Sequence, residues 1–171
     1  AFAPVDYNPR AAVDEWSRDF GVGANYFSQQ AVARLIPVAG IDMPDIPQSA
    51  FPLRLKRVQD LMLEGDERAR KIYETIGVYF GYTVAHYCSF YQPVRHLEVL
   101  GRVVSGEGGE IILAEARKVL QVEFPELADL HFYEPDEREK RHGQAAEPGE
   151  QILRVEQWHQ APDCRTDSEA D

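Results

Sequence analysis

One stretch, residues 67–90, constrains the fold more than any other part of the sequence. Its apolar side chains recur around nearly the whole circumference of a helix after the first two turns: Ile72, Ile76, Val78, Tyr79, Phe80, Tyr82, Val84 and Tyr87. A helix that is apolar nearly all round is buried on several sides. Asp66, directly before the stretch, is a suitable N-cap because its carboxylate can accept from the first free amides. We therefore expect the chain to fold around this helix.

Two glycines within this predicted helix indicate how it packs. Gly77, Gly81 and Ala85 are spaced four apart and share one helix face. Glycine inside a helix costs about 0.5–1 kcal/mol relative to alanine, so two on one face require a compensating gain. We predict that another backbone packs closely on this face. Close contact with a ligand is the alternative interpretation.

The segments before this helix predict shorter elements. Residues 2–7 are apolar with alternation, which indicates a strand, and the charged residues 14–19 indicate an exposed loop. An apolar stripe predicts a helix over 26–36 that ends near a proline. Prolines make 40–52 a connector, and a second amphipathic pattern predicts a helix over 53–62.

After the long helix, the sequence predicts a strand, a glycine-rich turn and a helix. The strand covers 97–100, the turn 101–109 and the helix begins near Ile111, and a further short strand covers 127–133. Such a turn suits a phosphate or nucleotide, because glycine allows close approach and the helix N-terminus offers free amides. A glycine-rich helix entry without ligand remains the alternative, since neither GxGxxG nor a P-loop lysine is present.

Composition excludes several classes of function. Lys plus Arg number 18 and Asp plus Glu 29, which gives a net charge of −11 and argues against nucleic acid or an anionic membrane as the main partner. No apolar run approaches the roughly 20 residues that span a bilayer, so we expect a soluble, cytoplasmic protein. Two cysteines are too few for a disulfide framework or a four-cysteine zinc site, so we expect no zinc and name no metal-ligating residue.

The sequence does not point to a catalytic residue. Cys88 lies in the apolar helix, where burial raises the pKa of a thiol, and Cys164 lies in a polar end. His86, two residues from Cys88, points in another direction on a helix and is best explained as a core histidine. Asp14, with its acidic neighbours, could supply a general base, although a solvated loop explains it better.

The order of these features resembles the C-terminal half of the ROK-family sugar kinases (repressor, open reading frame and kinase). The resemblance runs over residues 2–146 and is most specific from Val99 to Gly109, in the sequence Val-Leu-Gly-Arg-Val-Val-Ser-Gly-Glu-Gly-Gly. Weaker support comes from 141–145, Arg-His-Gly-Gln-Ala. Residues 147–171 depart from the family and are expected to form an acidic, disordered tail.

This resemblance implies a fold, an activity and a set of site residues. The fold is α/β, a helix-rich single lobe of the actin-like ATPase and sugar kinase (ribonuclease H-like) fold, incomplete in this chain. The implied parent activity is ATP-dependent phosphorylation of a hexose with Mg²⁺, as in glucokinase. By the motif match, the nucleotide-binding candidates are Gly101, Arg102, Ser105 and Gly106.

The chain also departs from the family in ways that affect function. The family has a second glycine where Arg102 stands, and its zinc cysteines would fall around residues 21–23, where none occurs. Its phosphate-binding motif and catalytic aspartate belong to an N-terminal lobe that we do not find in the sequence. We therefore expect a fragment or truncated member that is inactive alone. We expect the chain to form a homo-oligomer. A non-catalytic ROK-like dimerisation or regulatory module is the alternative, and a small acidic enzyme unrelated to kinases is a third.

Overall fold

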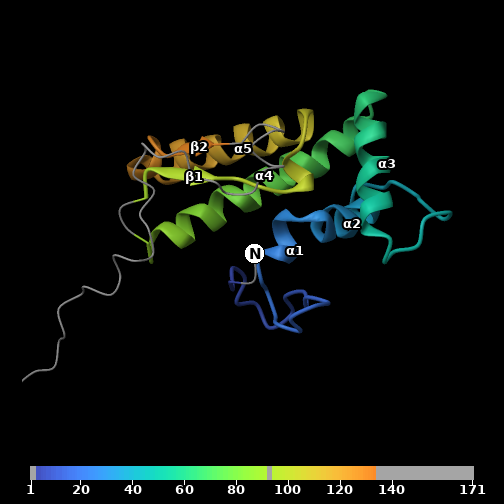
Figure 1. Ribbon diagram of the computed structural model, residues 1–171, viewed down its shortest axis with the longest axis horizontal. Helices are drawn as coiled ribbons and strands as arrows, with labels where there is room; N and C mark the ends of the chain where they lie inside the picture. Colours follow the sequence, from blue (N-terminus) through green and yellow to red (C-terminus); the bar gives the residue numbers. More distant parts are fainter. Residues whose placement is uncertain (1–2, 92–93, 134–171) are drawn as a thin grey trace, which may run out of the picture. The chain divides into compact units, whose positions relative to one another are not determined.

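The computed structural model describes residues 3–91 and 94–133 of the chain. This part is helix-rich and contains a small two-stranded parallel sheet, which is compatible with the predicted α/β class (Figure 1). The helices and strands are α1 (Ala24–Phe27), α2 (Gln29–Val38), α3 (Phe51–Leu63), α4 (Glu67–Cys88), β1 (His96–Glu98), α5 (Glu107–Glu123) and β2 (His131–Tyr133). Short 3-10 helices span Arg102–Val104 (η1) and Pro125–Leu127 (η2). The predicted tail at 147–171 and the domain boundary at 146 lie outside the described residues.

Helix α4 begins where the sequence predicts, at a carboxylate cap. Asp66 Oδ1 accepts from the backbone N–H of Arg68 at 2.9 Å, and the Arg68 guanidinium pairs with the same carboxylate. Hydrogen bonds from Arg68 hold the pKa of Asp66 at about 2. Arg68 also donates to the Gly40 carbonyl at 3.0 Å, so one side chain joins the start of α4 to the connector after α2.

The glycine face of α4 packs against α5, as predicted. A Cβ on Gly77 would lie 2.6 Å from the Glu115 Cβ, and one on Gly81 would lie 2.7 Å from the Val119 Cβ. Figure 1 shows the two helices running alongside each other, and α5 is the most extensive packing partner of α4. The close approach of two backbones, rather than contact with a ligand, explains these glycines.

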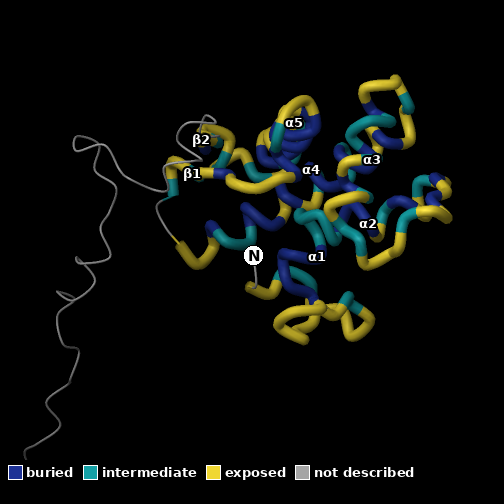
Figure 2. Tube along the Cα trace, turned by 45° about the vertical axis from the view of Figure 1, so that its right-hand side comes forward, coloured by how far each residue is buried: buried dark blue, intermediate teal, exposed yellow. Residues whose placement is uncertain are grey.

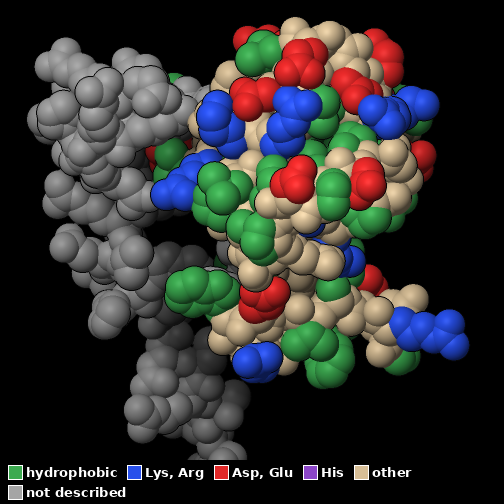
Figure 3. Space-filling model, turned by 90° about the vertical axis from the view of Figure 1, so that its right-hand side faces the viewer, with side chains coloured by type: hydrophobic (Ala, Val, Ile, Leu, Met, Phe, Trp, Pro, Cys, Tyr) green, Lys and Arg blue, Asp and Glu red, His purple; other side chains and the backbone are tan. Residues whose placement is uncertain are grey.

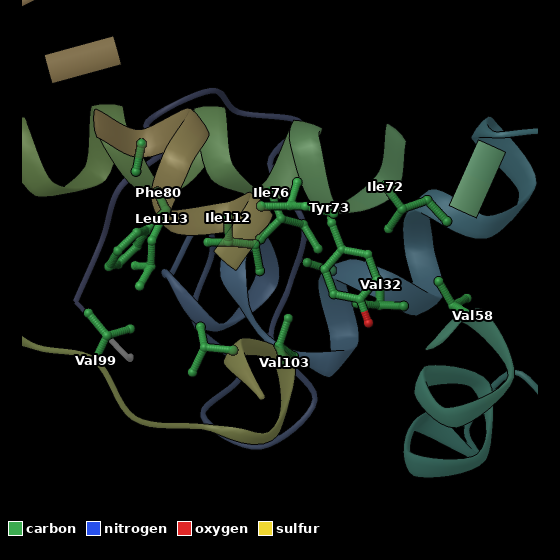
Figure 4. Close-up of a cluster of buried hydrophobic side chains, with 14 of the residues drawn as sticks. Val32, Val58, Ile72, Tyr73, Ile76, Phe80, Val99, Val103, Ile112 and Leu113 are labelled. Atoms are coloured by element: carbon green, nitrogen blue, oxygen red, sulfur yellow. The ribbon is translucent and has the colours of Figure 1, made fainter. Parts of the chain in front are cut away.

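The hydrophobic core surrounds α4 on several sides. Figure 2 shows buried segments on α2, α4 and α5, and Figure 4 shows apolar side chains from these helices meeting those from α3 and from the segment that follows β1. The labelled members are Val32, Val58, Ile72, Tyr73, Ile76, Phe80, Val99, Val103, Ile112 and Leu113. This arrangement confirms that the long apolar helix organises the fold.

The N-terminal segment differs from the prediction. Pro4 forms a single antiparallel bridge with Val22, and the N–H groups of Val5 and Asp6 both donate to the Gly21 carbonyl. Two donors on one acceptor cannot continue as a strand ladder, so the predicted strand over residues 2–7 is wrong from residue 3 onward. The first two residues lie outside the described part.

The other predicted elements are present with shifted ends. The helix predicted over 26–36 is split into α1 and α2 at Ser28, which is extended (φ −118°, ψ −175°) and caps α2 through Gln30. Both strands are shorter than predicted, and η2 occupies the start of the segment predicted as the second strand. In the described part of the chain, none of the helices is both long and apolar enough to cross a membrane.

Candidate functional site

The sheet and the helix that joins its strands form one βαβ unit. Strands β1 and β2 run parallel, with His96 opposite His131 and Leu97 opposite Phe132. Leu97 and Phe132 face the helices, where the Phe132 ring centroid lies 5.8 Å from that of Phe80. The first and third residues of each strand point away from the helices and are exposed. The described sheet is therefore covered by helices on one face.

The loop at the carboxyl end of β1 contains all four nucleotide-binding candidates. Gly101 has φ +144° and Gly106 has φ +67°, conformations that side chains rarely adopt. A Cβ on either glycine would meet no atom within 4 Å, so backbone conformation rather than crowding selects them. The Ser105 hydroxyl donates to the Gly101 carbonyl at 3.4 Å and closes the loop. This loop lies open at the surface, beside the start of α5.

At Gly108 and Gly109, crowding by neighbouring atoms rather than backbone conformation explains why the residue is glycine. A Cβ on Gly108 would collide with the Tyr73 ring of α4, and one on Gly109 would collide with the Val104 carbonyl. Tyr73 is fully buried, which raises the pKa of its phenol, and its hydroxyl has no hydrogen-bond partner among the described residues. These contacts fix the start of α5 against α4 and thereby set the position of the loop.

The charges beside the loop are mixed. Arg102 is exposed, and α5 carries Glu107 and Glu110 in its first turn. Glu107 lies 3.8 Å from a guanidinium nitrogen of Arg70, which also binds Glu74 at 3.1 Å. Among the described residues, the ion-pair partner of Glu107 is Arg70 and not the neighbouring Arg102.

Asp14 is the clearest difference between the predicted and the observed surroundings of a candidate residue. Its side chain is fully buried rather than solvated, and its carboxylate accepts from the N–H groups of Trp16 at 3.0 Å and Ser17 at 2.7 Å. The Gln30 amide donates to it at 3.0 Å. The bond from Ser17 is the main cause that lowers the pKa of Asp14. These bonds give Asp14 a structural role, whereas Glu15 and Asp19 are exposed.

His86 and Cys88 are not brought together as a pair. His86 is half-buried among aromatic rings, with its Nε2 3.5 Å from the Tyr7 hydroxyl and its ring centroid 5.1 Å from that of Phe90. Cys88 is a buried free thiol, and burial raises its pKa as the sequence predicts. Cys164 lies outside the described residues.

Sequence reasoning missed a cavity of about 650 Å³ at the amino ends of β1 and β2. Its polar and thiol lining comes from Cys88, Arg95, His96, Glu126, Asp129 and His131. The His96 and His131 rings are stacked with centroids 5.4 Å apart. They are distant in the sequence and meet only through the register of parallel strands, so no local motif could have revealed them. Within 3–91 and 94–133, no three His, Cys, Asp or Glu side chains come together as a metal site.

The structure thus places Gly101, Arg102, Ser105 and Gly106 in one open loop at the carboxyl end of β1. Comparison of the chain with protein-family models, with curated proteins and with solved structures gives no match in any of the three.

Proposed function

We propose that this chain is part of a ROK-family sugar kinase and supplies nucleotide contacts through the loop at residues 101–106. The parent reaction is the ATP-dependent phosphorylation of a hexose. The observation that carries the proposal is the unit of β1, α5 and β2, in which a glycine loop joins the carboxyl end of a strand to a helix. Ligands of parallel α/β sheets bind outside the carboxyl ends of the strands. Gly101 and Gly106 leave this side open.

The one-sided sheet supports placing the unit within a larger α/β lobe. Parallel sheets are normally covered on both faces, because the crossover helices lie on each side. Here the outer side of the described strands is exposed and bears His96, Glu98, His131 and Tyr133. A sheet of two three-residue strands is also small by comparison with ordinary parallel sheets. Both features favour an actin-like ATPase lobe of which this unit forms one part.

The proposal includes that the chain alone does not catalyse phosphoryl transfer. That reaction needs a base within reach of the sugar hydroxyl, together with phosphate and Mg²⁺ ligands. The described residues hold no such group of metal-ligating side chains, so we assign Mg²⁺ to none of them. We expect purified protein with ATP, Mg²⁺ and glucose to form no glucose 6-phosphate above the rate without protein. Sustained multiple turnovers would contradict this part of the proposal.

Nucleotide contact is tested by titrating the full chain with adenosine, ADP and ATP in a calorimeter. We expect at least one of these ligands to bind in the millimolar range or more tightly. Arg102→Ala should weaken that binding by about five- to tenfold, the loss of roughly 1 kcal/mol of cation–π contact with a base. Arg57→Ala, at a partly exposed arginine of α3 that pairs with Glu64, is the control and should leave binding unchanged. The absence of heat with all three ligands at millimolar concentration would overturn the nucleotide site.

An interaction module is the second candidate, favoured by the exposed rings of the N-terminal segment. Trp16 is 84% exposed, Tyr7 71% and Phe20 62%. Rigidly held, exposed aromatic side chains are typical anchors of protein interfaces. By contrast, the face shown in Figure 3 has acidic and basic side chains interspersed with scattered apolar ones.

Light scattering at micromolar concentration tests this second candidate. We expect a dimer that Trp16→Ala converts to a monomer, because the substitution removes the indole and keeps the backbone N–H that binds Asp14. Leu53→Ala, which removes an exposed apolar side chain of α3, is the matched control. A strict monomer for the unaltered chain would remove the support for an interaction module.

A further inference from the structure

We propose that the cavity at the amino ends of β1 and β2 binds a small zwitterion, of the class of an α-amino acid with an apolar side chain. Its volume of about 650 Å³ falls within the range of roughly 300–1,000 Å³ that is typical of small-molecule sites. The cavity lies at the opposite ends of the strands from the loop at 101–106, so this inference is independent of the nucleotide site proposed above.

The charged side chains that line the cavity come from two segments that are distant in the sequence. Arg95 directly precedes β1, whereas Glu126 belongs to η2 and Asp129 lies between η2 and β2. The pairing of the parallel strands brings these segments together, and the His131 N–H donates to the Arg95 carbonyl at 2.9 Å. One segment therefore supplies a guanidinium to the cavity and the other supplies two carboxylates.

These three charges do not neutralise one another. The side chains of Arg95, Glu126 and Asp129 line the same cavity, yet within residues 3–91 and 94–133 they form neither a hydrogen bond nor an ion pair. On α3, by contrast, Arg57 pairs with Glu64 at 3.1 Å. Opposite charges that line one cavity without pairing remain available to a ligand.

A ligand that satisfies both kinds of charge must itself carry both. A guanidinium binds a carboxylate through two parallel N–H···O bonds, and a protein carboxylate accepts hydrogen bonds from an ammonium group. A purely anionic ligand would meet the two carboxylates of the cavity, and a purely cationic ligand would meet its guanidinium. An α-amino acid carries one group of each sign and can satisfy both.

The rest of the lining suits an apolar side chain on that ligand. The side chains of Cys88 and Leu130 are buried, and Leu127 is half-buried. The imidazole rings of His96 and His131 add aromatic surface, since they stack with centroids 5.4 Å apart and 18° between their planes. Such surfaces bind aliphatic or aromatic groups through burial and dispersion. Phenylalanine is therefore a suitable probe.

The test is a calorimetric titration of the full chain with L-phenylalanine and with two analogues that each lack one of its charges. Phenethylamine lacks the carboxylate, 3-phenylpropionate lacks the ammonium group, and both keep the phenyl ring. At pH 7 and low ionic strength, we expect phenylalanine to bind in the millimolar range or more tightly. Each analogue should bind about tenfold more weakly, because it loses one charge-assisted interaction. Glycine, which keeps both charges and lacks the ring, should also bind more weakly.

Two substitutions assign the charges to residues. Arg95→Met should weaken the binding of phenylalanine and 3-phenylpropionate by about tenfold and should not weaken that of phenethylamine. The double variant Glu126→Gln/Asp129→Asn should weaken phenylalanine and phenethylamine and should not weaken 3-phenylpropionate. A merely structural role would not give this crossed pattern, because a disturbed cavity weakens every ligand. Arg10→Met and Asp45→Asn, at exposed residues outside the cavity, are the matched controls and should leave all affinities unchanged.

The outcomes decide the proposal in either direction. Phenylalanine that binds more tightly than both analogues, with the crossed pattern in the variants, supports it. Equal affinity for phenylalanine and either analogue would overturn it, and so would an uncrossed pattern or a loss that the control variants share. The absence of binding of all these ligands at millimolar concentration would also overturn it. Circular dichroism of each variant checks that the fold is retained.

Discussion

Asp14 holds a loop without regular secondary structure through a single carboxylate. Its three acceptor contacts satisfy two backbone N–H groups and fasten the loop to Gln30 of α2. Removing an acceptor of this kind leaves donors unpaired, which costs about 1–3 kcal/mol. We expect Asp14→Ala to lower the free energy of unfolding by that amount and Asp14→Asn by less, as measured by urea denaturation. Asp19→Asn, at an exposed carboxylate of the same loop, is the control and should have little effect.

The contribution of Asp14 also has a defined pH dependence. Its hydrogen bonds lower the pKa from 3.8 in the folded state, so the folded protein holds this proton less readily than the unfolded chain. The stabilisation is therefore complete above about pH 4 and is lost as pH falls through the lower folded pKa. The stability difference between the natural protein and Asp14→Asn should stay constant from pH 7 to about 5 and shrink below pH 4. A difference that grows on acidification would contradict this assignment.

Some residues could be interpreted correctly from the sequence and others could not. Asp66 precedes a strong helical pattern, so its capping role follows from local chain geometry alone. Asp14 lies in a charged run with no periodicity, and its burial depends on Gln30, which belongs to a different element. Local spacing predicts caps and turns, whereas a buried carboxylate is decided by tertiary contacts that composition does not record.

At the scale of elements, the α4–α5 contact makes the sharpest prediction about packing. Alanine is a better helix former than glycine by up to about 1 kcal/mol, so Gly→Ala at an exposed helix position stabilises. At Gly77 the new methyl would lie 2.7 Å from the Ile112 carbonyl oxygen, and at Gly81 it would lie 2.7 Å from the Val119 Cβ. We expect each Gly→Ala variant to lower the free energy of unfolding by about 1–3 kcal/mol, because the helices must separate.

Urea denaturation again supplies the measurement, with Lys71→Ala on the exposed side of α4 as control. Lys71→Ala should change the free energy of unfolding by no more than about 0.5 kcal/mol. Gly77→Ala should lower the free energy of unfolding at least as much as Gly81→Ala does. The new methyl at Gly77 meets the Ile112 backbone oxygen, which moves less readily than the Val119 side chain that faces Gly81. An unchanged or raised stability in both glycine variants would mean that the helices do not approach as closely as described.

The type of most elements could be predicted, and their ends could not. Helical periodicity and the two-glycine face predict α4 and its packing, because both depend on residues within one helix. The strands are only three residues long, and their register pairs His96 with His131 across the whole of α5. No sequence window contains that pairing, which is why the cavity beside the two histidines was missed.

At the scale of the molecule, the sequence predicts the order of strand, glycine loop and helix, and the ligand of the loop remains a prediction. The positions of Gly101 and Gly106 follow from the motif, and their positive φ angles explain why glycine is needed. Crowding at Gly108 and Gly109 could not be foreseen, because it depends on Tyr73 and Val104 in three dimensions.

The uneven distribution of packing over the molecule predicts where the fold opens first. The centre of α4 is buried on several sides, with Tyr73 and Ile76 fully buried, whereas the strands have an exposed outer side and only three residues each. Local opening follows burial and contact density, so backbone amides of β1 and β2 should exchange with deuterium much faster than those of residues 72–85. Mass spectrometry of peptides from the full chain at pH 7 measures this directly. Strand amides that exchange as slowly as the centre of α4 would show that the sheet is covered in solution, contrary to the one-sided sheet on which the proposed larger lobe depends.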